Sequence, residues 1–183
     1  MKLDQNSGLL DGAEYVPSPN QDERPDPMHI DTLIIHAISL PPDCFGGCHV
    51  EELFTNCLNP DQHDYFAEIQ DLRVSAHFLI KREGQLLQFV PTTMRAWHAG
   101  ESCFQGCEKV NDFSIGIELE GCDTVAFEEA QYARLAAVTQ SIREAYPAIT
   151  LNRIVGHSDV SPGRKTDPGP SFDWPSYRKR LKT

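Results

Sequence analysis

One segment near the end of the chain, residues 157–170, combines side chains that bind metals with residues that stiffen the backbone. It begins at His157, contains Lys165 and Asp167, and holds three prolines and two glycines. Proline fixes its own φ and pushes the preceding residue into an extended conformation, so Asp167, which precedes Pro168, has a narrow backbone range. The segment therefore has the composition of half a metal site with a positive charge beside it, and the other half must come from elsewhere.

His36 is the candidate for the other half. It lies in a nearly continuous apolar run over residues 32–39, which predicts a central strand buried on both faces. A buried imidazole needs a partner for its ring nitrogens, so a hydrogen-bonded core histidine is the alternative. Two imidazoles and a carboxylate suit Zn²⁺ and leave a fourth position for water. Asp159, two residues after His157, competes with Asp167 as the carboxylate, and the pattern alone does not decide between them.

Two glutamates share one face of the strand predicted over residues 113–120, where apolar and polar residues alternate at period two. A carboxylate at Glu118 or Glu120 that faces a metal could accept a proton from water; the alternative is a solvated strand face. Gly116 lies on the same face and favours a crowded site, because glycine permits close approach. Lys165 could stabilise a developing oxyanion, or it is a solvated loop lysine.

The predicted elements that position these residues mix strands and helices in an order typical of an α+β domain. Strands are predicted over residues 32–39, 76–81, 85–90, 113–120 and 153–156, with the second and third forming a hairpin. Helices are predicted over residues 49–56, 127–146 and 171–181, the longest with a buried stripe at helical spacing. Segment 57–71 is predicted to be irregular, segment 91–106 to be a long connection, and residues 1–31 to form an irregular N-terminal arm. We therefore predict a single domain over residues 1–183, with a mixed central β-sheet and packed helices.

Composition limits the classes of partner. A formal net charge of −11 over 183 residues argues against binding to nucleic acid or to an anionic membrane surface. We find no run of ~18 apolar residues and no apolar segment of signal-peptide type, so a cytoplasmic location is expected. The six cysteines are then expected to be reduced thiols. Cys44/Cys48 and Cys103/Cys107 have a three-residue gap, which disfavours a zinc ribbon.

Other residues are candidates for binding a ligand. Trp97-His98, in a long connection, could form an apolar wall, although tryptophan is as often plain core. Arg73, Arg95, Lys109 and Arg164 are scattered basic residues in an acidic chain. Solvation explains most such residues, but a substrate with several carboxylates would need a few of them.

Five stretches of the sequence match a known family. They run collinearly through nearly the whole chain, at residues 36–42, 73–77, 95–100, 111–121 and 165–174. On these motifs the chain resembles the zinc-dependent N-acetylmuramoyl-L-alanine amidases, and within them the cytoplasmic AmpD type, which acts on 1,6-anhydro-muropeptides. The resemblance implies the fold of that family, a single mixed α+β domain.

The resemblance also implies a role for each candidate residue. His36, His157 and Asp167 match the zinc ligands, which favours Asp167 over Asp159. Glu118, rather than Glu120, matches the catalytic acid/base, and Lys165 matches the lysine that supports the tetrahedral intermediate. Positions at which relatives contact the sugar or the peptide are matched by Arg73, Ala96, Trp97, Lys109 and Arg164.

The reaction that the resemblance implies is hydrolysis of the lactyl–L-alanine amide bond in peptidoglycan recycling. The expected partner is a small anhydro-muropeptide, and the enzyme is expected to be a monomer. Two other functions compete with this one. Related peptidoglycan-recognition domains only bind muropeptides, but the intact set of Glu118, Lys165 and three ligand candidates argues against that. An exported amidase acting on intact wall is disfavoured by the lack of a recognisable signal segment.

Overall fold

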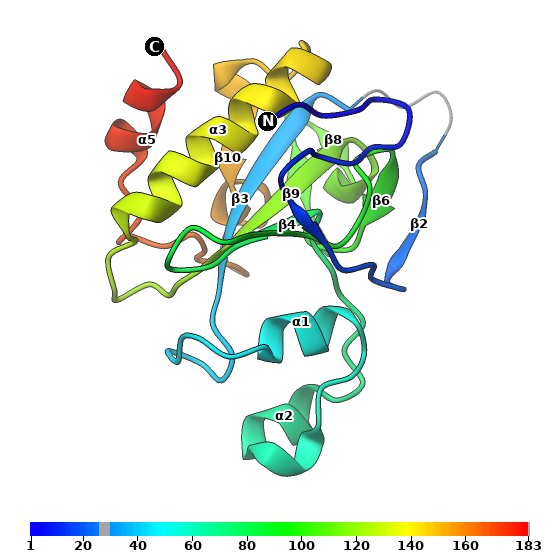
Figure 1. Cartoon of the computed structure of the whole chain (residues 1–183), viewed down its shortest axis with the longest axis vertical. Helices are drawn as coiled ribbons and strands as arrows, with labels where there is room; N and C mark the ends of the chain where they lie inside the picture. Colours follow the sequence, from blue (N-terminus) through cyan, green and yellow to red (C-terminus); the bar gives the residue numbers. More distant parts are fainter. Residues whose placement is uncertain (26–29, 183) are drawn as a thin grey trace.

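The structure is a computed structural model that describes residues 1–25 and 30–182. Its centre is a six-stranded sheet in the order β1-β5-β4-β9-β3-β10, and Figure 1 labels its strands β4, β9, β3 and β10. Neighbours from β4 to β10 are parallel, whereas β5 runs antiparallel to β4. The strands are β1 Glu14–Tyr15, β3 Thr32–Ile38, β4 Phe78–Ile80, β5 Leu86–Gln88, β9 Ser114–Glu120 and β10 Ile154–Gly156. The predicted α+β fold with a mixed sheet and the predicted hairpin are confirmed.

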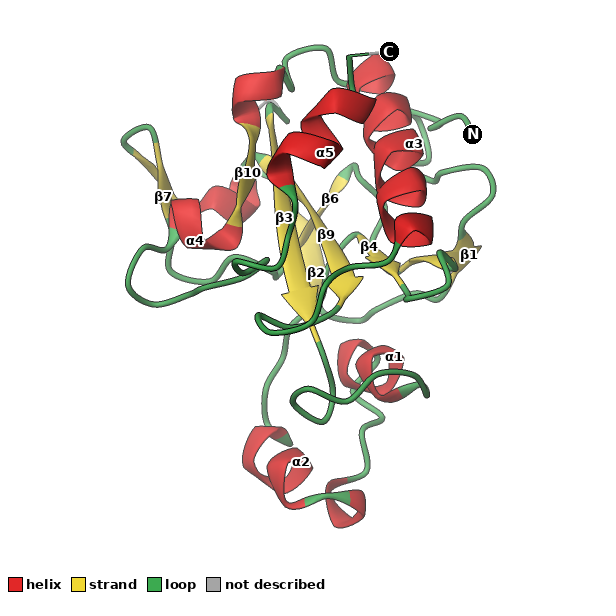
Figure 2. Cartoon of the chain, turned by 90° about the vertical axis from the view of Figure 1, so that its left-hand side faces the viewer, coloured by secondary structure: helices red, strands yellow, loops and turns green. Residues whose placement is uncertain are grey.

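Successive side chains along each strand point to opposite sides of the sheet, so the sheet has two faces of different composition. On one face, apolar residues such as Leu33, Ile35, Ile115 and Ile117 are fully buried in one large cluster. Helices α3, Glu129–Ala145, and α5, Trp174–Arg180, supply the other side of that cluster. Figure 2 shows both helices on the same side of the sheet. The residues between these apolar positions, on the opposite face, are the ones that carry the candidate chemistry.

A second apolar cluster covers part of that opposite face. It joins β4 and β5 to α1, His49–Phe54, and α2, Asp64–Ile69. Both helices lie beyond the carboxyl ends of β3 and β9 (Figure 1). The prediction of an irregular segment over residues 57–71 is wrong, because it contains a 3₁₀ turn, Pro60–Gln62, and α2. Tyr65, Phe66 and Ile69 of helix α2 pack on this cluster, but the helix has only 6 residues, too few for a helical period to be detected from the sequence.

The N-terminal arm is also more regular than predicted. Within residues 1–31, β1 pairs with β5, and β2, Gln21–Glu23, pairs with β6, Met94–Ala96. The long connection predicted over residues 91–106 contains two short strands that were not predicted, β6 and β7, Cys103–Phe104. These strands have two or three residues, too few for a detectable period. Residues 26–29 of the predicted arm lie outside the described residues.

The remaining short elements are β8, Cys107–Glu108, the 3₁₀ turns Val110–Asp112 and Leu151–Arg153, and α4, His157–Val160.

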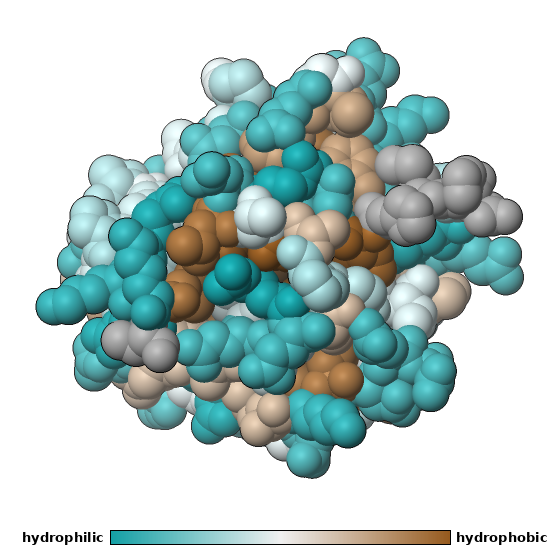
Figure 3. Space-filling view, turned by 90° about the horizontal axis from the view of Figure 1, so that it is seen from above, coloured by the Kyte–Doolittle hydropathy of each residue, from teal (hydrophilic) through white to brown (hydrophobic). Residues whose placement is uncertain are grey.

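Seen from above, most of the visible face is hydrophilic, with apolar atoms exposed mainly in hollows between polar side chains (Figure 3). Within residues 1–25 and 30–182, no helix combines the length and apolar character needed to cross a membrane. All six cysteines are free thiols.

Candidate active site

Sheet register brings the two histidines and the glutamate together. Strands β3 and β9 are aligned so that His36 lies opposite Glu118. Strand β10 pairs with β3 through Gly156 and Ile35, so His157, the next residue, arrives beside His36. The strand predicted over residues 153–156 ends at Gly156 in the structure, as expected. The loop predicted after it is wrong at its start, because His157 is the first residue of the short helix α4.

Asp167 completes this group. Its Oδ2 lies 3.1 Å from Nδ1 of His36 and 3.1 Å from Nδ1 of His157, and the two Nδ1 atoms are 3.0 Å apart. The loop that carries Asp167 approaches β10 closely, since a Cβ on Gly156 would lie 2.8 Å from Cδ of Pro168. Glycine at position 156 is therefore needed for this packing.

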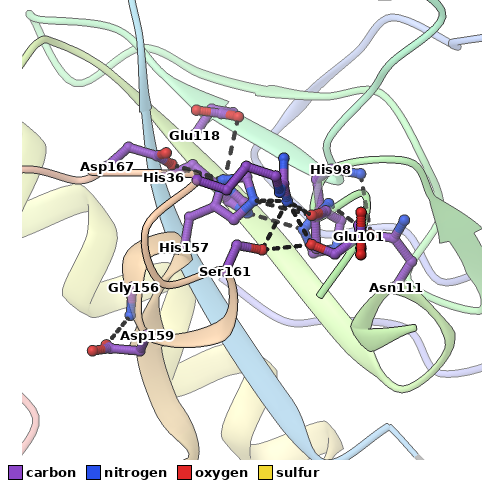
Figure 4. A network of polar contacts seen from close by, with 12 residues as sticks. His36, His98, Glu101, Asn111, Glu118, Gly156, His157, Asp159, Ser161 and Asp167 are labelled. Carbon is purple, nitrogen blue, oxygen red and sulfur yellow. Dashed lines mark hydrogen bonds and ion pairs between the residues drawn. The ribbon is translucent and has the colours of Figure 1, made fainter. Parts of the chain in front are cut away.

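Asp159, the competing carboxylate, is turned away from the cluster (Figure 4). Its Oδ2 accepts a hydrogen bond of 2.8 Å from the backbone N–H of Gly156. That bond satisfies one of the free backbone donors at the start of α4. The structure therefore gives Asp159 a helix-capping contact and brings Asp167, not Asp159, to the two imidazoles.

The donor set fits a zinc ion. Nε2 of His157 lies 3.1 Å from the carbonyl oxygen of Ala99 and 3.4 Å from a guanidinium nitrogen of Arg164. The shorter contact is with an atom that can only accept, which favours a proton on Nε2 and leaves a lone pair on Nδ1. Tetrahedral ligands ~2.1 Å from zinc lie about 3.4 Å from one another, close to the separations observed. His36, His157 and Asp167 also form the group of possible metal ligands found within the described part of the chain. Converging lone pairs of this kind are stabilised by a cation.

Protonation states agree with that fit. Burial lowers the pKa of His36 to about 4, so the imidazole is neutral near pH 7. Burial alone would raise the pKa of the Asp167 carboxyl, but its polar contacts with the imidazoles of His157 and His36 outweigh burial and hold the pKa below its usual range. A neutral imidazole and an ionised carboxylate are the forms that bind zinc.

Glu118 is a buried carboxylate beside these donors. Its side chain lies with Oε1 3.9 Å from Nδ1 of His36, and its Oε2 has no hydrogen-bond partner among the described residues. Burial raises the pKa of Glu118 well above its usual value, the charge of Asp167 raises it further, and Lys165 opposes both. A carboxylate with a raised pKa is suited to exchanging protons near neutral pH.

The alternative of a solvated strand face is wrong, because Glu118 is 8% exposed and Glu120 is 5% exposed. The two differ in their partners. Glu120 accepts hydrogen bonds from the backbone N–H groups of Gly46 and Arg82, so both of its oxygens are occupied. Glu118 is the glutamate with an oxygen available for chemistry. Lys165 is exposed, and its charge lowers the pKa values of His36 and Glu118, which puts it near both.

The candidate substrate contacts are distributed unevenly. Lys109 and Arg164 line one hollow of about 600 Å³. A guanidinium nitrogen of Arg164 also donates to the carbonyl oxygens of Ala99 and Glu101. The structure therefore brings these two basic residues together at one side of the site.

The other three candidates are held by their own neighbours. Arg73 is exposed and donates to the carbonyl oxygens of Gln70 and Leu72. Trp97 is partly buried, and its Nε1 donates to Asp22. Ala96 is fully buried in the second apolar cluster, so its side chain belongs to the core.

Sequence reasoning missed the role of His98. It was interpreted with Trp97 as an apolar wall, but it is buried and its Nδ1 lies 2.9 Å from Nε2 of His36. The available signal was Gly116, which was expected to permit close approach. A Cβ at position 116 would lie 2.5 Å from the His98 ring, so the crowding is confirmed and the imidazole is its cause.

The chain is similar to known proteins along most of its length. The family described as N-acetylmuramoyl-L-alanine amidase matches residues 26–170. The chain is 56% identical over 173 residues to the 1,6-anhydro-N-acetylmuramyl-L-alanine amidase AmpD of Salmonella typhimurium strain SL1344, covering 94% of this chain and 92% of the relative. A crystal structure of a Se-Met AmpD derivative superposes with a TM-score of 0.95 at 54% identity and covers 99% of both chains.

A more distant solved structure is that of E. coli AmiD in complex with the substrate anhydro-N-acetylmuramic acid-L-Ala-D-γ-Glu-L-Lys. It is similar with a TM-score of 0.60 at 29% identity, over 86% of this chain and 60% of that chain. Together these matches confirm the resemblance inferred from the sequence motifs.

Proposed function

This chain belongs to the N-acetylmuramoyl-L-alanine amidase family, and we propose that it hydrolyses 1,6-anhydro-N-acetylmuramyl peptides in peptidoglycan recycling. The bond cleaved is the amide that joins the lactyl group of the sugar to L-alanine. Relatives that share more than half of their residues with this chain carry that activity in their names. The observation that carries the proposal is the convergence of His36, His157 and Asp167 beside the unpartnered Glu118 oxygen.

The proposed metal is Zn²⁺, held by Nδ1 of His36, Nδ1 of His157 and Oδ2 of Asp167. Two nitrogen donors and one carboxylate oxygen at 3.0–3.1 Å from one another support this choice. Zinc in such a site supplies Lewis-acid polarisation of the amide carbonyl and lowers the pKa of the attacking water.

Glu118 is proposed to move the proton. It accepts a proton from water as the water oxygen bonds to the amide carbon, and it then donates that proton to the leaving nitrogen of L-alanine as the C–N bond breaks. Its raised pKa and its free Oε2 support both steps. The ammonium of Lys165 is proposed to share the negative charge that develops on the carbonyl oxygen.

Substrate contacts are proposed for Arg73, Ala96, Trp97, Lys109 and Arg164. Lys109 and Arg164, which line one hollow, would meet carboxylates of the peptide. Trp97 would offer an apolar wall to the anhydro sugar. Ala96 is fully buried, so any contact it makes with substrate would involve its backbone.

We propose that the enzyme is a cytoplasmic monomer that acts on soluble muropeptides. The net charge of −11 supports a soluble substrate, because a wall rich in carboxylates would repel an acidic protein that lacks a dedicated basic surface. Nucleic acid and membrane partners are disfavoured by the same charge.

The direct test is to incubate the purified protein with anhydro-muropeptide and identify the products by mass. We expect free peptide and free anhydro sugar, loss of both with a chelator, and recovery on addition of Zn²⁺. Binding without cleavage would indicate a recognition domain instead. The same assay at matched concentration should give much lower rates on the reducing-end muropeptide and on sacculi, and comparable rates on all three would indicate a wall amidase.

A further inference from the structure

One dipeptide, His98-Ala99, contacts both histidine ligand candidates at the ring nitrogen opposite the one that faces Asp167. Nδ1 of His98 lies 2.9 Å from Nε2 of His36, and the carbonyl oxygen of Ala99 lies 3.1 Å from Nε2 of His157. These are the ring nitrogens that point away from the cluster (Figure 4). Both ligand rings are therefore held through their far sides by adjacent residues of a single segment.

The proton arrangement in this segment is self-consistent. The Ala99 carbonyl oxygen, which can only accept, favours a proton on Nε2 of His157 over the longer contact of that nitrogen with Arg164. Nε2 of His98 lies 3.3 Å from the hydroxyl oxygen of Ser114, which can accept a hydrogen bond from a protonated Nε2. With that donor assignment, Nδ1 of His98 is a lone pair that accepts from Nε2 of His36. Each ligand imidazole then turns an unprotonated Nδ1 toward Asp167.

The dipeptide is itself clamped. Oδ1 of Asn111 accepts hydrogen bonds from the backbone N–H of His98, at 3.2 Å, and of Ala99, at 2.8 Å. Asn111 lies in the 3₁₀ turn that leads into β9, the strand that carries Glu118. The His98 ring is also pressed against Gly116 of the same strand. The dipeptide is thus fixed to the strand that carries the proposed acid/base.

We infer that His98-Ala99, clamped by Asn111, orients both histidine ligands, so that His98 and Asn111 are positioning residues of the metal site. This inference rests on the zinc site of the proposed function. Partners that fix the tautomer and the ring orientation of ligating histidines typically contribute about 10–100-fold to metal affinity. Removing the contact of His98 with His36, or the contact of Asn111 with the dipeptide, should therefore weaken zinc binding itself, independently of turnover.

The test compares variants that remove the contact with variants that keep it. His98→Phe preserves a ring against Gly116 but removes the acceptor for His36, whereas the amide oxygen of His98→Asn can replace Nδ1. Asn111→Leu removes the acceptor for both N–H groups, and Asn111→Asp keeps it. Zinc affinity is measured by competition with a chromophoric chelator, and the visible spectrum of the Co²⁺ form reports ligand geometry. Melting of each metal-free variant reports its fold.

A matched control lies on the other face of the sheet. Thr139→Val removes a buried hydrogen bond to the hydroxyl of Tyr177, where the oxygens are 2.7 Å apart, and should lower stability without changing zinc affinity. We expect His98→Phe and Asn111→Leu to bind zinc about 10–100-fold more weakly than wild type. His98→Asn and Asn111→Asp should stay within a few-fold of wild type.

The outcomes separate the inference from the proposed function. Wild-type zinc affinity in a folded His98→Phe or Asn111→Leu protein overturns the inference while leaving the zinc site intact. An equal loss in Thr139→Val also overturns it, because the effect would then follow stability. If His98→Phe does not fold, the Asn111 pair decides alone. A wild-type protein that binds no zinc overturns the proposed function and the inference together.

Discussion

Replacing Glu118 with glutamine exchanges one oxygen of the site for an amide nitrogen and leaves the side-chain shape unchanged. The substitution removes the ability to accept and return a proton, so we expect kcat to fall by about 10²–10⁴-fold. Zinc content should be unchanged, because Glu118 is not one of the three converging donors. The substitution also removes a charge from a residue that is only 8% exposed.

The second expected effect is on the stability of the metal-free protein. Burial disfavours the ionised form of Glu118, and its Oε2 has no partner among the described residues. An unsatisfied buried group costs about 1–3 kcal/mol, and more when it is charged. The glutamine amide would also lack a partner there, but it carries no charge, so Glu118→Gln should raise the free energy of unfolding at neutral pH by about 1–3 kcal/mol, or Tm by several degrees.

The sign of the pH dependence follows from the raised pKa. An unfolded glutamate titrates near its ordinary pKa of 4.5, whereas the folded one keeps its proton to higher pH. Wild-type stability therefore falls as pH rises through the window above 4.5, since the folded state binds more protons there. Glutamine does not titrate, so the advantage of Glu118→Gln should be absent below that window and should grow as pH rises through it.

The assay is urea unfolding of the chelated protein across that pH range, with Glu120→Gln as the matched control. Glu120 accepts two backbone hydrogen bonds, so its substitution should destabilise the protein by about 1–3 kcal/mol and leave turnover nearly intact. The reasoning would be supported if Glu118→Gln raised the free energy of unfolding and Glu120→Gln lowered it, although both residues lie on one strand face. A Glu118→Gln protein that is no more stable than wild type at pH 8, or that turns over at near wild-type rate, would refute it.

Three further outcomes are expected. Asp167→Ala should lose nearly all zinc by elemental analysis, whereas Asp159→Ala should keep zinc and lose only a capping bond to Gly156, lowering Tm by roughly 2–4 °C; the reverse pattern would reassign the carboxylate. Lys165→Ala should lower kcat by about 10²–10³-fold at constant zinc content, and an unchanged kcat would remove it from the mechanism. Arg24→Met should reduce the free energy of unfolding by roughly 2–4 kcal/mol, because four backbone carbonyls lose a charged donor; an unchanged urea midpoint would contradict this.

Much of the framework follows from local sequence patterns. The period-two run around Glu118 and the apolar run around His36 are the two central strands, and their alternation determines which side chains share a face. The long helix was predicted to within two residues at its start and one at its end. These features depend on residues close in sequence, so a single chain is enough to reveal them. The sequence motifs also indicated the family.

Tertiary packing decided what local patterns left open. Asp159 and Asp167 both follow His157 closely. The bond from Gly156 N–H holds Asp159 away, and the packing of Pro168 against Gly156 brings Asp167 to the imidazoles. Glu120 and Glu118 lie on one strand face, but backbone N–H groups from distant segments occupy only Glu120.

His98 shows the same limit most clearly, since its contact with His36 joins residues 62 positions apart. The short strands of the arm and helix α2 were missed because their regular structure depends on partners far along the chain. By itself, the sequence determined the residue types, the strand faces and the family. Long-range contacts decided which oxygens and nitrogens of the candidate site lie close together, and periodicity along the sequence does not reveal such contacts.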